Sequence, residues 1–130
     1  MSKSGRRYDT GMGVGTLISL EEYLNTTYRP DCDFVEGHVL ERNVGTRRHA
    51  YAQGRICVWF GSRSDQLRLE PLSELRMRIG KNRVRIPDVV VEEMPLREEE
   101  VFTSAPYLCI EVMSPEDTVS RLQERLDEYL

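Results

Sequence analysis

The sequence predicts an α/β fold, and three features of the chain support this prediction. An apolar pattern of helical spacing follows the capping residue Thr46, and two stretches of alternating apolar residues flank Gly80. A nearly continuous apolar stretch of strand length, residues 107–113 (YLCIEVM), leads into a second amphipathic helix. The 130 residues correspond to one domain with its own core.

The N-terminal part is predicted to hold a tail, a short helix and a hairpin. Residues 1–16 mix Gly, Ser, Arg and Lys without periodicity, which indicates a flexible tail. An S-x-x-E capping box at residues 19–22 predicts a helix over residues 20–25. Two short apolar stretches around Glu36-Gly37 then predict a hairpin over residues 33–42.

A longer helix is predicted to begin after its cap, Thr46, and to end near Phe60. Gly61 marks its end, because glycine readily adopts the left-handed conformation that terminates helices. Ile56, Trp59 and Phe60 recur at helical spacing and are expected to form the apolar face of this helix.

A hairpin of two long strands is predicted next, over residues 67–79 and 83–91, with its turn at residues 80–82. One face of the hairpin is apolar and the other carries arginines. Two interpretations of the arginine face stay open: it holds phosphates, or it is a solvated face balanced by the acidic loop 92–100. The arginines are Arg76, Arg78, Arg83 and Arg85.

The last elements are a strand and a helix. The apolar stretch 107–113 is typical of a strand covered on both faces, and residues 114–117 (SPED) are a strong helix start. A buried strand that feeds an amphipathic helix normally continues into a parallel strand, and the sequence ends before one. We therefore expect residues 17–130 to form a single domain that lacks its last core strand.

Composition excludes several classes of protein. The net charge of −4 argues against a generally basic nucleic-acid coat protein. Three distant cysteines, without a C-x-x-C pair, argue against a disulfide framework or a zinc ribbon and favour a reducing cytoplasm. The sequence contains neither an apolar stretch of membrane-spanning length nor a secretory signal. The expected location is the cytoplasm, without a membrane partner.

Two acidic residues lie in apolar strand contexts. Asp88 follows Pro87 and leads into Val89, and Glu111 lies inside the apolar stretch 107–113. An ionised carboxylate in such a strand needs a partner, because burial removes its hydration. Two hypotheses stay open: the acids meet at one sheet edge and share a hard cation, or Asp88 caps a strand and Glu111 pairs with an arginine.

These residues carry a family resemblance. The "PD" pair, a spacer of 22 residues and an acid in an apolar strand resemble the PD-(D/E)XK nuclease superfamily. More closely, residues 16–130 are similar to the Uma-two family of restriction endonucleases. The shared segments are, in order, SLEEYL, DFVEGHVLERN, RIPDVVV, LCIEVMSPED and QERLDEYL.

The resemblance implies a restriction-endonuclease-like core, with a central mixed sheet flanked by helices, and an endonuclease acting on DNA. Asp88 and Glu111 match the metal-binding acids of the family, for Mg²⁺ or alternatively Mn²⁺, and the Val112 carbonyl is a candidate third ligand. Glu74 is a candidate accessory acid, with a solvated strand residue as the alternative.

Many relatives have a lysine two residues after the acid or on the following helix, where this chain has Met113 and Arg125. Helical geometry places Arg125 beside the apolar stripe, within reach of Glu111, where its charge would stabilise a phosphorane-like transition state. The alternative is a surface ion pair with Glu128 or Asp127.

A second hypothesis follows from the departures from the family pattern. A chain without the lysine and the last strand would be a catalytically inactive remnant that binds nucleic acid or forms a homodimer through an exposed strand edge. The two histidines, His38 and His49, are not expected to form a metal site, and His49 is expected on a helix face or at the edge of the core.

Overall fold

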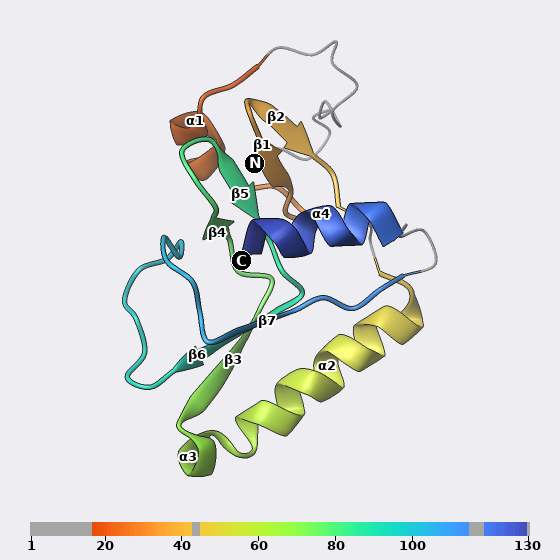
Figure 1. Cartoon of the computed structure of the whole chain (residues 1–130), viewed down its shortest axis with the longest axis vertical. Coiled ribbons are helices and arrows are strands. Elements are labelled where there is room, and N and C mark those ends of the chain that lie inside the picture. Colours follow the sequence, from red (N-terminus) through yellow and green to blue (C-terminus); the bar gives the residue numbers. More distant parts are fainter. Residues whose placement is uncertain (1–16, 43–44, 115–118, 130) are drawn as a thin grey trace.

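The structure is a computed structural model that describes residues 17–42, 45–114 and 119–129 (Figure 1). The predicted tail and most of the predicted helix start at residues 114–117 lie outside the described residues. In chain order the elements are α1 (Leu20–Leu24), β1 (Asp33–Val35), β2 (His38–Leu40), α2 (Arg47–Gly61), α3 (Ser64–Leu67), β3 (Leu69–Ser73), β4 (Met77–Arg78), β5 (Arg83–Arg85), β6 (Val89–Glu93), β7 (Leu108–Ile110) and α4 (Val119–Tyr129).

The strands form two antiparallel sheets, ordered β2-β1-β5-β4 and β3-β6-β7. The α/β class is confirmed. The described strands do not form the predicted single mixed sheet, because all of their pairings are antiparallel. The one parallel contact among the described residues is the isolated bridge between Met77 and Phe102. Both long predicted strands break, at Glu74 and at Pro87. Glu74 has a φ of 54°, and Pro87 lacks the N–H that a continuous ladder needs. Each half therefore joins a different sheet.

The predicted short helix and the predicted hairpin of the N-terminal part are confirmed. Ser19 caps α1 by accepting a hydrogen bond from the Glu22 backbone N–H at 3.0 Å. Strands β1 and β2 pair around Glu36 and Gly37, whose φ values of 51° and 91° are those of a hairpin turn with two left-handed residues. This part encloses an aromatic core, formed by Tyr23, Tyr28, Cys32, Phe34, Val39 and Val84.

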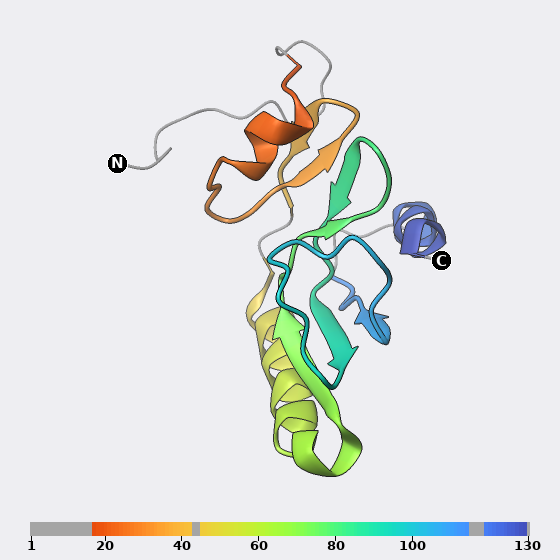
Figure 2. The same cartoon turned by 90° about the vertical axis from the view of Figure 1, so that its left-hand side faces the viewer.

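Helix α2 lies along one side of the sheet that β3, β6 and β7 form (Figure 2). Thr46 caps it by accepting from the His49 backbone N–H, as the sequence predicts. The helix ends one residue beyond the predicted Phe60; Gly61 is its last residue and does not adopt the predicted left-handed conformation, and the C-cap Ser62 has a φ of −75°. The predicted apolar face is wrong for Trp59, which is 48% exposed, whereas Ile56 and Phe60 are half-buried.

The central strand of the three-stranded sheet is β6. Its residues Val89, Val90 and Val91 are fully buried, and they pair with β3 on one side and β7 on the other. The prediction that residues 107–113 form a strand covered on both faces is wrong, because β7 has three residues and lies at an edge of the sheet. Leu108 and Met113 are exposed.

Most arginines of the predicted hairpin face form ion pairs with carboxylates elsewhere in the chain. For these arginines, both interpretations are wrong: they are neither free to hold phosphates nor balanced by the acidic loop 92–100. Arg76 donates two hydrogen bonds to Asp31, both of 2.8 Å, and its guanidinium lies over the Tyr23 ring. Arg85 donates to Asp33 at 3.1 Å and to Glu128 of α4 at 2.8 Å. The latter contact joins α4 to β5.

No helix among the described residues has both the length and the apolar character needed to cross a membrane.

Candidate active site

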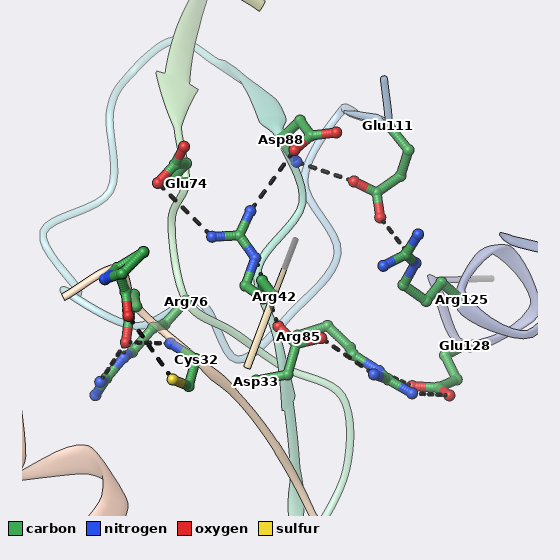
Figure 3. A network of polar contacts seen from close by, with 12 residues as sticks. Cys32, Asp33, Arg42, Glu74, Arg76, Arg85, Asp88, Glu111, Arg125 and Glu128 are labelled. Atoms are coloured by element: carbon green, nitrogen blue, oxygen red, sulfur yellow. Dashed lines mark hydrogen bonds and ion pairs between the residues drawn. The ribbon is translucent and has the colours of Figure 1, made fainter. Parts of the chain in front are cut away.

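The sheet register brings together the two acids that the sequence singles out. Asp88 directly precedes β6 and Glu111 directly follows β7, and the pairing of Val89 with Ile110 places them side by side. The Asp88 backbone N–H donates to Glu111 Oε1 at 3.0 Å (Figure 3). The Val112 N–H donates to Asp88 Oδ2 at 2.6 Å. Each carboxylate is therefore held by the backbone of the other strand.

Two basic side chains that the sequence analysis did not assign to the site contact Asp88. Arg42, which follows β2, has its Nη2 3.6 Å from Asp88 Oδ1, and His49, in the first turn of α2, has its Nε2 3.3 Å from Asp88 Oδ2. A Cβ at position 45 would lie 2.5 Å from His49 Nδ1, so Gly45 leaves the space for this ring. The signal for Arg42 was its place in the shared segment DFVEGHVLERN.

Glu74 lies at the rim of the site. Its side chain is 47% exposed, and its Oε1 lies 3.7 Å from Arg42 Nη1, so Arg42 bridges Glu74 and Asp88 (Figure 3). Gln53 of α2 donates to Glu74 at 3.3 Å and to the Asp88 backbone carbonyl at 2.8 Å. Glu74 is thus both solvated, as the alternative predicts, and connected to the paired acids.

Arg125 reaches the site from α4. Its Nε lies 3.4 Å from Glu111 Oε2, the contact that helical geometry predicts. Glu128 instead pairs with Arg83 and Arg85, and Asp127 accepts a hydrogen bond from Gln123, so among the described residues neither acid forms the alternative surface pair with Arg125.

Burial raises the pKa of the Glu111 carboxyl above its ordinary value. The Asp88 backbone N–H lowers that pKa, whereas the Asp88 charge raises it, and Arg125 and the Tyr129 hydroxyl lower it. Two buried carboxylates side by side repel each other, so a further cation between them would stabilise both in their charged forms.

The side chains fit Mg²⁺ with a small protein ligand set. Among the described residues no three His, Cys, Asp or Glu side chains are grouped to hold a metal ion. Mg²⁺, however, commonly binds through one or two carboxylates and keeps several waters. Asp88 Oδ1 contacts Arg42 at the long distance of 3.6 Å, and both acids line one pocket. Val112 also lines this pocket, and its backbone N–H donates a hydrogen bond to Asp88.

Tyr129→Phe is expected to lower the free energy of unfolding at neutral pH by about 1.5–3 kcal/mol. The Tyr129 hydroxyl donates to Glu111 Oε2 at 3.0 Å, and its loss leaves a buried charge with one donor fewer. Urea unfolding measures the change. Tyr107→Phe, at an exposed tyrosine, is the matched control. Equal stability of the two variants would show that the hydrogen bond to Glu111 contributes nothing.

The fold and the site define an α/β protein with two antiparallel sheets and a pair of buried carboxylates at the end of one of them. A crystal structure described as a putative nuclease belonging to DUF820, from Anabaena variabilis, has the same fold, with a TM-score of 0.73 and 23% identity. The match covers 87% of this chain and 68% of that one.

Residues 20–130 match the model of the Uma2 family, described as "Putative restriction endonuclease", and the chain belongs to this family. The resemblance noted from the sequence is thereby confirmed. The comparison with curated proteins finds no match.

Proposed function

We propose that this protein is a metal-dependent endonuclease that hydrolyses DNA phosphodiester bonds at the pocket of Asp88 and Glu111. The observation that carries the proposal is the reciprocal arrangement of the two acids, each held by the backbone of the other's strand, with Arg42 and Arg125 beside them. Membership of a family described as restriction endonucleases supports the reaction class.

Asp88 and Glu111 are the residues that would hold Mg²⁺ or Mn²⁺, with the Val112 carbonyl as the proposed third ligand. The bound ion would lower the pKa of a water molecule and neutralise charge on the phosphate. The chain itself supplies orientation, because backbone N–H groups fix both carboxylates and His49 contacts Asp88 Oδ2.

Arg42 and Arg125 supply positive charge at the pocket. A guanidinium binds phosphate oxygens in a planar fork and stabilises negative charge that develops on them. It does not give up its proton near neutral pH, so neither arginine serves as a general base. We assign them to phosphate binding, and Glu74 to the orientation of Arg42 at the rim.

A specific observation favours the second candidate, an inactive nucleic-acid-binding module. Both carboxylates already accept hydrogen bonds from the protein, and basic side chains approach each of them. Lys81, the lysine among the described residues, lies at the tip of the β4–β5 turn rather than in the pocket. Such a pocket compensates its own charge without a metal ion.

Two measurements separate these candidates. Supercoiled plasmid DNA incubated with the protein and Mg²⁺ or Mn²⁺ is expected to be nicked, and EDTA is expected to stop the reaction. Calorimetric titration with the same ions is expected to show saturable heat. Saturable heat without cleavage of DNA contradicts hydrolysis, and the absence of both heat and cleavage establishes the inactive module.

A further inference from the structure

The side of α2 that faces away from the sheet carries an unusual set of exposed side chains. Figures 1 and 2 show β3 on one side of this helix and no described element on the other. The exposed residues recur every three or four positions, so they share one face of the helix and of the turn that follows it. We name this surface the α2 outer face; it consists of Arg47, Arg48, Tyr51, Arg55, Val58, Trp59 and Arg63.

The α2 outer face is positively charged in a protein that is acidic as a whole. Residues 46–64 contain four arginines and neither Asp nor Glu, although the chain carries a net charge of −4. Arg47, Arg48 and Arg55 form no ion pair with a carboxylate of the described residues, unlike Arg76, Arg83 and Arg85. Their charge is therefore available to a partner.

The geometry points to double-stranded DNA as the partner: we propose that the α2 outer face binds the phosphate backbone of a duplex and leads it to the pocket. This inference rests on the proposed function and names the surface that holds the substrate. A polyanion complements a row of unpaired arginines, and phosphate contacts of this kind position a duplex without reading its sequence.

The position of the helix relative to the pocket supports this substrate path. Arg47 and Arg48 lie in the same first turn of α2 as His49, which contacts Asp88 and is about 100° from Arg48 around the helix axis. The 15 residues of α2 extend over about 22 Å, the rise of about six base pairs along one strand. A backbone that follows the arginines thus arrives next to the paired acids.

Two other occupants fit less well. A single strand would need a row of free aromatic faces for its bases, but of the two rings on this surface, Tyr51 and Trp59, the second is occupied: the Arg63 guanidinium lies 4.4 Å from the centre of the Trp59 ring, and the Phe60 ring abuts it edge-on at 5.0 Å. A second copy of the chain, docked by two-fold symmetry, would place arginines against arginines. The charge therefore selects a phosphate backbone rather than another α2 outer face.

The test is fluorescence anisotropy with a labelled duplex of about 20 base pairs, roughly three times the span of α2, in EDTA so that no cleavage occurs. Arg48→Ala/Arg55→Ala is expected to raise Kd about tenfold and to lower the slope of log K against log salt by about 2. The matched control, Arg29→Ala/Lys81→Ala, removes two exposed charges elsewhere and is expected to change Kd by less than about twofold.

Several outcomes would overturn the inference. Equal effects of the two double variants would show that total charge, not the α2 outer face, determines binding. Tighter binding of the single strand, or of duplex RNA of the same sequence, would show that this nucleic acid, and not duplex DNA, is the partner. A dimer in sedimentation that dissociates in Arg48→Ala/Arg55→Ala would show that the partner is a second copy of the chain. Binding by the α2 outer face without cleavage in Mg²⁺ would leave this inference standing and reject the proposed hydrolysis.

Discussion

Asp88→Asn is expected to reduce metal-dependent DNA cleavage by about 10³-fold or more, because an ion bound at the paired carboxylates contributes several kcal/mol of transition-state stabilisation. The substitution removes the charge and retains the shape. Asn keeps an oxygen that can accept the Val112 N–H, so the link between the two strands persists. Initial rates of plasmid nicking in Mg²⁺ measure the effect.

Glu111→Gln is expected to have an effect of similar size, since it removes the other proposed ligand and leaves an oxygen for the Asp88 N–H. Glu74→Gln is the matched control: it also neutralises one acid near Arg42, but at an exposed position, and a loss of less than about tenfold is expected. Cleavage by Asp88→Asn at the parent rate would show that the reaction, if present, takes place elsewhere.

Arg85→Met is expected to lower the free energy of unfolding by about 3–5 kcal/mol, because it leaves the buried carboxylate of Asp33 without its closest cation. Arg85 and Asp33 are 7% and 6% exposed and are joined by a 3.1 Å hydrogen bond. Burial alone would lower the pKa of Arg85, but its hydrogen bonds to Glu128 and Asp33 raise it above the ordinary value. Arg42 remains 3.9 Å from Asp33, too far for a full replacement.

Urea unfolding of Arg85→Met at pH 7 measures this loss. Arg83→Met is the matched control, since Arg83 shares the Glu128 partner but is partly exposed, and a loss below about 1 kcal/mol is expected. Asp33→Asn combined with Arg85→Met is expected to recover part of the stability, because no unpaired buried charge remains. A stability of Arg85→Met equal to that of the control would mean that the ion pair does not hold β1, β5 and α4 together.

Local signals predicted the early elements of this fold well. Ser19, the Glu36-Gly37 turn and Thr46 each act through contacts within three residues, so the sequence itself contains both partners. The paired acids were also predictable, because a carboxylate in an apolar strand stands out by its cost of burial.

The errors all concern contacts between distant segments. The division into two sheets depends on how the chain crosses over at Glu74 and Pro87, and the short β7 depends on its place at a sheet edge. Neither is encoded in the local alternation of apolar residues, which is the same for a central strand and for an edge strand.

The sequence by itself determined the α/β class, the family and the pair Asp88 and Glu111, because each depends on residue types in local order. The tertiary structure alone decided that Arg42 and His49 reach Asp88, that Glu128 pairs with Arg83 and Arg85, and that Arg47, Arg48 and Arg55 meet no carboxylate among the described residues. The physical reason is the same in each case. The effect of a charge depends on which opposite charge folding brings within about 4 Å of it, and those partners lie tens of residues away.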